Sequence, residues 1–279
     1  MKKKVPVVFW LVLALMTAAV YPFLEPFWLK CTRVEISLPD EYQALDGTKI
    51  MQIADLHLRT GLGFNEAKVI AWARRNRPDL IAITGDFIET PGVRDAFFNF
   101  LSFLPKVPKF AVLGNWERWV RIDPRQWKRL MLERDTELLT NESTRVHVRL
   151  GGIVVAGVDD AYTHRADIGK TLRGCPEGYR ILLTHSPEIF DEPGITGFNL
   201  VLAAHCHNGQ IRLPWYGPLW LPHGCEKYVY GLFRKNGTWL YVTSGVGTSL
   251  LPMRFLARPE VVMLVLKAER KKETIIKKD

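Results

Sequence analysis

Short apolar runs alternate with amphipathic stretches along most of the chain, from about residue 34 onward. Runs of β-branched and aliphatic residues predict strands at 34–38, 49–54, 80–84, 109–113, 144–150, 153–157, 180–184, 200–203, 238–243 and 260–266. A helical period predicts helices at 65–75, 93–103, 124–134 and 168–172. The early part reads as strand–helix–strand units, the later part is richer in strands, and no repeat or linker separates them. The pattern therefore predicts an α/β fold in one domain with two packed sheets.

The amino-terminal stretch at residues 5–24 carries no charge and is long enough to cross a membrane as a helix. We expect a membrane anchor, with a cleavable signal peptide and a buried core helix as alternatives. Pro6, Pro22 and Pro26 leave open a helix that lies in the interface instead of spanning it. Three lysines precede the stretch and two basic residues follow it, a weak bias toward an outward-facing domain, so the side of the membrane stays open.

These features divide the chain into three parts: a basic amino terminus and anchor at 1–29, one folded domain at 30–268 and a basic tail at 269–279. The 279 residues are 47% hydrophobic, which is ample for one core. The net charge of +9 favours an anionic partner, such as a lipid surface or a phosphorylated substrate. Much of the excess lies at the two ends, and no basic and aromatic stripe joins it, so we expect no nucleic-acid partner.

The four cysteines, Cys31, Cys175, Cys206 and Cys225, form no CxxC pair and no regular spacing. The redox compartment therefore stays open at this point. Cys206 is interpreted as a small packing residue, because a metal site for hard phosphate oxygens seldom needs a thiolate.

Residues of the metal-ligating types follow five of the predicted strands. They are Asp55 and His57, Asp86, Asn115, His185, and His205 and His207. The carboxyl ends of strands meet at one edge of an α/β sheet, so these separated clusters are expected to converge. Carboxylate, imidazole and carboxamide groups suit divalent manganese, iron or zinc. Alternation in extended backbone is expected to turn both members of Asp55-x-His57, and of His205-x-His207, toward the same side.

In this order the motifs D-x-H, GD, GN, a lone His and H-x-H resemble those of the calcineurin-like metallophosphoesterases, over residues 49–264. The resemblance implies a four-layer αββα sandwich with two divalent metal ions, Mn²⁺ in the first place and Fe or Zn as alternatives. It implies that Asp55, His57, Asp86 and His207 hold one ion and that Asp86, Asn115, His185 and His205 hold the other. Asp86 then bridges the ions, and a metal-activated water attacks phosphorus in line.

The family's usual Gly-Asn-His-Asp reads Gly114-Asn115-Trp116-Glu117 in this chain. Tryptophan cannot protonate a leaving group, so Glu117, His223 or a metal-bound water must substitute, or the leaving group must depart without help. A phosphate leaving from a diphosphate needs less protonation than an alkoxide, so the change favours a pyrophosphate bond. Members of the family that hydrolyse UDP-2,3-diacylglucosamine also lack this His. A catalytically impaired metal-binding paralogue is the alternative. The predicted catalytic residues are Asp86, Asn115 and Glu117.

Residues 209–214, 245–249 and 252–255 resemble the membrane-associated branch that includes these hydrolases. The apolar loop at 213–222 is interpreted as a lip for acyl chains or the bilayer, with an ordinary packed loop equally open. Arg212, His223 and Arg254 are the predicted substrate contacts. We expect hydrolysis of UDP-2,3-diacylglucosamine to lipid X and UMP, in lipid A biosynthesis at the inner (cell) membrane. A phosphodiesterase acting on envelope phosphodiesters is the alternative, and the oligomeric state is open.

Overall fold

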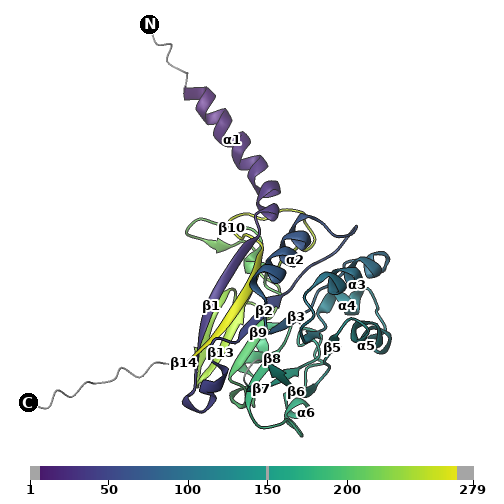
Figure 1. Ribbon diagram of the computed structural model, residues 1–279. Helices are drawn as coiled ribbons and strands as arrows, with labels where there is room; N and C mark the ends of the chain where they lie inside the picture. The colour runs from purple at the N-terminus through teal and green to yellow at the C-terminus, as the bar shows by residue number, and fades with distance from the viewer. Residues whose placement is uncertain (1–6, 149–150, 269–279) are drawn as a thin grey trace, which may run out of the picture.

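The computed structural model describes residues 7–148 and 151–268, and the predicted basic tail and the lysines at 2–4 lie outside them. Helix α1 (Val7–Leu24) projects from the domain, as Figure 1 shows. The remaining helices are α2 (Phe64–Asn76), α3 (Arg94–Phe103), α4 (Asn115–Trp119), α5 (Pro124–Leu132) and α6 (Ile168–Leu172), with 3₁₀ turns η1 (Glu25–Phe27), η2 (Asp40–Leu45), η3 (Pro91–Val93), η4 (Pro187–Asp191), η5 (Ile195–Gly197) and η6 (His207–Gly209).

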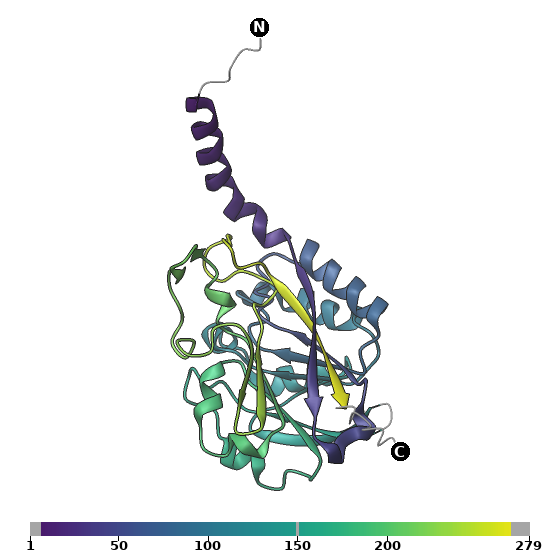
Figure 2. The same cartoon turned by 90° about the vertical axis from the view of Figure 1, so that its left-hand side faces the viewer.

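The strands form two six-stranded mixed sheets. The first has the order β1 (Lys30–Leu38), β14 (Glu260–Ala268), β2 (Lys49–Ile53), β3 (Leu80–Thr84), β4 (Lys109–Val112) and β5 (Thr136–Leu138). The second has the order β12 (Gly231–Lys235), β13 (Thr238–Val242), β9 (Leu200–Ala203), β8 (Tyr179–Leu183), β7 (Gly151–Gly157) and β6 (Glu142–Val148). Strands β2 to β5 run parallel, as do β13, β9, β8 and β7, and β1 lies beside β14 in parallel, which Figure 2 shows clearly.

Strand β3 shows how the sequence builds the layers. Leu80 and Ala82 pack in the cluster between the two sheets, whereas Ile81 and Ile83 pack on the opposite face, under the helices. Successive side chains of a strand point to opposite faces, so a strand covered on both sides is apolar throughout. Helices α2, α3 and α5 cover the outer face of the first sheet, and α6 with η4 and η5 covers the second. The predicted α/β architecture with two packed sheets is confirmed.

Every predicted strand is present, with ends shifted by a few residues, although residues 149–150 of one lie outside the described part. The prediction missed β5 and β12, together with α4 and the 3₁₀ turns. The loop at 213–222 was expected to contain no strand, yet its ends form a small hairpin, β10 (Arg212–Leu213) and β11 (Gly217–Pro218). Strands this short carry too few residues for a periodic signal.

The amino-terminal helix ends against the domain at η1, where the Glu25 side chain is fully buried. Within residues 7–148 and 151–268, no helix has both the length and the apolarity needed to cross a membrane. The predicted membrane-spanning segment therefore has no support from the structure.

Candidate metal centre

The seven predicted ligands lie together at one edge of the sandwich, and all are buried. Asp55 and His57 follow β2, Asp86 follows β3, Asn115 follows β4, His185 follows β8, and His205 and His207 follow β9. These strands are parallel within each sheet, so their carboxyl ends meet at the same edge. The convergence predicted from strand ends is thus what the fold produces.

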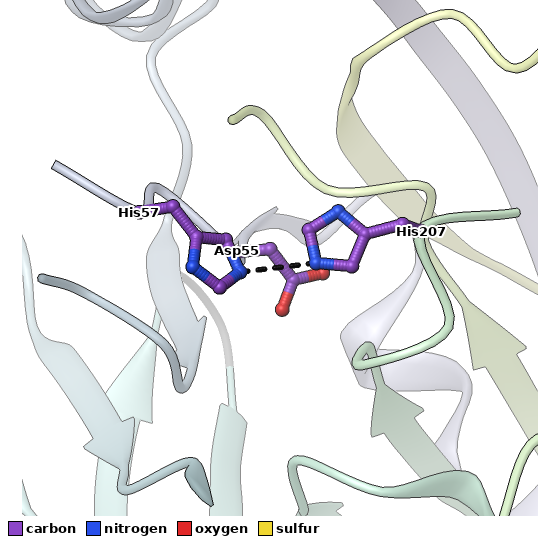
Figure 3. A group of neighbouring side chains, drawn as sticks. All are labelled: Asp55, His57 and His207. Atoms are coloured by element: carbon purple, nitrogen blue, oxygen red, sulfur yellow. Dashed lines mark hydrogen bonds between the residues drawn. The ribbon is translucent and has the colours of Figure 1, made fainter. Parts of the chain in front are cut away.

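The ligand atoms form two groups. In the first, those of Asp55, His57 and His207 lie within 4.8 Å of one another, and the Nε2 atoms of the two histidines are 3.0 Å apart. Figure 3 shows the two rings turned toward each other beside the Asp55 carboxylate. This group fits one metal ion.

The second group contains Asp86, His185 and His205, again within 4.8 Å. Asn115 Oδ1 lies 3.1 Å from His185 Nε2, which places the carboxamide in this group. Asp86 Oδ2 is 3.2 Å from His185 Nε2 and 3.5 Å from His57 Nε2. Asp86 therefore reaches both groups, as a bridging ligand must.

The chemistry of these groups fits divalent cations. Asp55 Oδ2 is buried with no hydrogen-bond partner among the described residues, so its lone pairs are free for a metal. Burial lowers the pKa of His205 to about 3, and the neighbouring His185 adds to this, so the His205 imidazole is neutral and can donate a lone pair. Burial alone lowers the pKa of His185, but the Asp86 and Asp55 carboxylates outweigh burial and raise it to about 10. A site that holds a proton this tightly attracts positive charge.

The backbone of the ligand loops is not extended, which corrects the expected alternation. Five ligands have a left-handed conformation: Asp55 (φ 49°), His57 (φ 46°), Asp86 (φ 53°), His205 (φ 70°) and His207 (φ 48°). The paired side chains meet because the chain turns sharply after each strand, not because alternate residues share a face. Gly114 allows this packing, since a Cβ at that position would collide with the Asp86 side chain.

Glu117, predicted as a catalytic residue, holds the ligand loops together instead. Its Oε2 accepts hydrogen bonds from the backbone N–H of Asp86 (3.0 Å) and Gly114 (2.8 Å), and its Oε1 accepts one from Phe87 (2.7 Å). Burial raises the pKa of Glu117 to about 7, and the charge of Asp86 adds to this. The side chain is fully buried and faces backbone donors, so proton transfer to a substrate is not its role.

Arg254, predicted as a substrate contact, is also fully buried. Its guanidinium donates to the backbone of Ala257 (2.8 Å) and Ser244 (2.8 Å), and its Nη2 lies 3.2 Å from His207 Nδ1. The structure therefore places it behind the candidate ligand His207, where no solvent reaches it. This prediction was wrong because sequence cannot distinguish a buried guanidinium from an exposed one.

The other two predicted substrate contacts lie nearer the surface. Arg212 donates to Oδ1 (2.9 Å) and the carbonyl (3.1 Å) of Asn208, next to His207 in sequence. His223 is exposed, with Nδ1 3.4 Å from Glu226 and its ring 6.4 Å from that of Tyr162. Contact of these side chains with a substrate stays a prediction.

A cavity of about 340 Å³ opens above the metal ligands. Asp86, Asn115, His205 and His207 line its polar side, and aromatic and aliphatic side chains form the rest, among them Trp116, Trp119, Tyr162, Trp220, Leu250 and Leu251. The Trp116 ring lies edge-on to His57 at 5.5 Å. The indole thus occupies the edge of the first metal group, where the family usually has an imidazole. Trp119 was not predicted as a site residue, although it lies one helical turn after Trp116 in α4.

Cys206 forms a disulfide with Cys225, which corrects its interpretation as a packing residue. The bond joins the turn between His205 and His207 to the loop that carries His223. The pair was missed because its separation of 19 residues matches no regular framework.

The calcineurin-like phosphoesterase family model matches residues 48–209. The chain is 31% identical over 253 residues to the uncharacterised metallophosphoesterase YkuE of Bacillus subtilis (strain 168), with 88% of each chain covered. It is 28% identical over 257 residues to the phosphodiesterase YaeI of Escherichia coli (strain K12), with 88% of this chain and 90% of that protein covered. The chain therefore belongs to the calcineurin-like metallophosphoesterase family, and the predicted family is confirmed. With this site it is a metal-dependent phosphoester hydrolase.

Proposed function

We propose that this enzyme hydrolyses the diphosphate bond of a lipid-linked substrate, with UDP-2,3-diacylglucosamine as the first candidate and UMP and lipid X as products. The observation that carries the proposal is the apolar cavity beside the metal ligands. Trp119, Trp220 and Leu250 form walls that suit an acyl chain, while the ligands lie where a phosphate must sit. A small polar phosphoester would leave these walls uncovered.

The residues around the cavity also favour a diphosphate. Trp116 replaces the usual proton donor, and the Glu117 carboxylate already accepts hydrogen bonds from backbone N–H groups. In the described part of the chain, the cavity lining has no imidazole or carboxyl group besides those of the metal ligands. A phosphate leaving group departs with less proton transfer than an alkoxide, so a diphosphate bond suits this site.

The two metal groups supply the remaining chemistry. Two divalent ions bound there would supply a nucleophilic water at neutral pH and stabilisation of the charge on the phosphoryl oxygens. Asp55, His57 and His207 would hold one ion, Asn115, His185 and His205 would hold the other, and Asp86 lies within reach of both groups. We propose Mn²⁺, with iron and zinc as alternatives that the same donors accept.

Exposed apolar side chains support a position at the surface of the cell (inner) membrane. Phe27, Trp215, Tyr216, Trp220 and Leu250 form what we call the apolar rim, and each is more than half exposed. They belong to η1 and to the loops at 213–222 and 249–256, at the end of the domain from which α1 emerges (Figure 1). Aromatic side chains favour the membrane–water interface, so the rim and α1 together fit an interfacial anchor.

The disulfide favours a second candidate, hydrolysis of phosphodiesters in the cell envelope. Disulfides persist in oxidising compartments and are rare in the cytosol, whereas UDP-2,3-diacylglucosamine is a cytoplasmic-face substrate. The Cys206–Cys225 pair and the outward charge bias both point to the envelope side.

The test is a UMP-release assay on detergent-solubilised full-length protein with UDP-2,3-diacylglucosamine and Mn²⁺. The Asp86→Ala variant should lose release, and Asp95→Ala, which removes an exposed carboxylate on α3, should keep it. Metal-dependent UMP release supports the first candidate. Absence of release, with hydrolysis of an aryl phosphodiester retained, overturns it in favour of the envelope candidate.

The membrane position is tested by pelleting the full-length protein with anionic phospholipid vesicles. The double variant Trp215→Ser/Trp220→Ser should bind less than wild type, while Phe103→Ser, an exposed aromatic residue on α3, should bind equally well. Equal binding of all three proteins would contradict the proposal that the loop at 213–222 contacts the membrane.

A further inference from the structure

The Arg254 side chain is a buried cation whose hydrogen bonds are satisfied by the backbone around it. Its Nε donates to Gly247 (3.0 Å), its Nη1 donates to Ala257 (2.8 Å) and Ser244 Oγ (2.9 Å), and its Nη2 donates to the Ser244 carbonyl (2.8 Å). Because the guanidinium is planar and is held by this many hydrogen bonds, it is fixed in one orientation. Arg254 is therefore a rigid element of the site.

This guanidinium touches His207 at two places. Nη2 lies 3.2 Å from the ring atom Nδ1, and Nη1 lies 3.3 Å from the His207 carbonyl oxygen. The opposite ring nitrogen, Nε2, faces His57 in the first metal group (Figure 3). Because His207 has a left-handed backbone, its ring direction depends on outside support, and Arg254 is in contact with both its backbone and its ring.

The amino-terminal segment holds Arg254 in turn. The backbone N–H of Arg254 donates to the Pro22 carbonyl at 2.8 Å. The buried Glu25 carboxylate accepts from the N–H groups of Leu256 (2.8 Å) and Ala257 (2.7 Å), shortly after Arg254. Residues 21–28 thus bind the backbone of Arg254 and of the residues just after it, although more than 200 residues separate the two segments in the sequence.

We propose that Arg254 is a positioning residue for His207, and that residues 21–28 set its place, so that the first metal group depends on the end of the amino-terminal helix. The second group has no such contact with these residues in the described part of the chain. The end of the predicted membrane anchor then also supports the metal centre, through Arg254. This inference rests on the metal centre and not on the proposed substrate.

The test measures metal binding without turnover. Full-length apoprotein is titrated with Mn²⁺ by calorimetry, and the loaded protein is examined by electron paramagnetic resonance, which distinguishes coupled from isolated Mn²⁺. Arg254→Lys keeps the charge but loses the fork, and should weaken one of the two Mn²⁺ equivalents about 10- to 100-fold. The other equivalent should change less than about twofold, and the coupled signal should give way to that of an isolated ion.

Two further variants keep the test decisive. Arg258→Lys is the matched control, because this exposed arginine donates to the Trp28 carbonyl without touching a ligand, and it should bind both equivalents as wild type does. Glu25→Gln changes the same network from the helix side, because its amide can accept from only one of the Leu256 and Ala257 N–H groups, and it should weaken the same equivalent as Arg254→Lys.

The affected group is assigned by combining variants. Arg254→Lys should add nothing in a His207→Ala background and should retain its effect in a His205→Ala background. Unchanged binding in both Arg254→Lys and Glu25→Gln overturns the proposal. Equal weakening of both equivalents in Glu25→Gln overturns it as well, because that result indicates a general loss of structure.

Discussion

The substitution Glu117→Gln tests whether this side chain holds the metal loops together. Oε2 accepts from the N–H groups of Asp86 and Gly114, and Oε1 accepts from those of Phe87 (2.7 Å) and Ile88 (3.5 Å). Glutamine keeps the length and shape of the side chain but replaces one oxygen by an amide that donates. Whichever way the amide turns, two buried N–H groups lose their acceptor.

The size of the effect follows from those two donors. A buried donor left without a partner costs about 1–3 kcal/mol, so the two donors together cost about 2–6 kcal/mol. The raised pKa of Glu117 means that its carboxylate is unfavourable in the folded state at pH 8, and the neutral amide relieves part of this cost. Glu117→Gln should therefore lower the free energy of unfolding by a net of about 1–3 kcal/mol. The measurement is urea unfolding of the apoprotein at pH 8, above the pKa of about 7 to which burial raises the carboxyl. At this pH the wild-type side chain is ionised, so the comparison is between a carboxylate and an amide.

Glu66 provides a matched control on another helix. It lies in the same Gly-x-x-Glu arrangement at the start of α2, where its Oε2 accepts a hydrogen bond from the Gly63 N–H at 2.7 Å. The amide oxygen of Glu66→Gln can accept this bond, so the loss should stay below about 1 kcal/mol. A loss in Glu117→Gln no larger than in Glu66→Gln would refute the structural role of Glu117.

Three further predictions concern other parts of the molecule. Trp116→His places an imidazole at the cavity and should raise hydrolysis of an unactivated alkyl phosphodiester about 100-fold, with little change for a diphosphate; equal changes would contradict the leaving-group argument. Burial raises the pKa of Asp191, but hydrogen bonds led by that from Lys235 outweigh it and lower the pKa to about 2. The stabilisation is therefore full above the usual value of about 3.9 and is lost as the pH falls through about 2, so acid unfolding of Asp191→Asn and wild type should converge there. Cys225→Ser should lower the free energy of unfolding by about 3 kcal/mol, and a reductant should abolish the difference from wild type.

The ligand set was predictable because each ligand directly follows an apolar strand. Strands buried on both faces, such as β3, are apolar at nearly every position, so their ends are easy to locate in the sequence. The edge strand β12 alternates exposed and half-buried positions and ends with two basic residues, which gave no comparable signal. Because these strands are so strongly buried, both the fold and the candidate metal ligands could be predicted from the sequence.

The supporting residues were harder to predict, for different reasons. Glu117 had a local signal, since Gly114-x-x-Glu117 is a helix-capping arrangement, but the missing family histidine drew attention to catalysis instead. Arg254 had no local signal, because its role depends on Pro22 and Glu25 at the other end of the chain. Contacts of this separation cannot be inferred from the spacing of residue types.

The left-handed backbone explains why such supporting residues are needed. Five of the seven ligands adopt this conformation, which costs about 1–2 kcal/mol for each residue that is not glycine. Aspartate and histidine tolerate it better than most residues, but the sum is still comparable with the net stability of a domain, about 5–15 kcal/mol. The metal ions cannot provide all of this support, because the loops must already be close to their final form for ions to bind. Glu117 and Arg254 contribute to it from the protein side, Glu117 through its hydrogen bonds to the backbone of Asp86 and Gly114, and Arg254 through its contacts with His207.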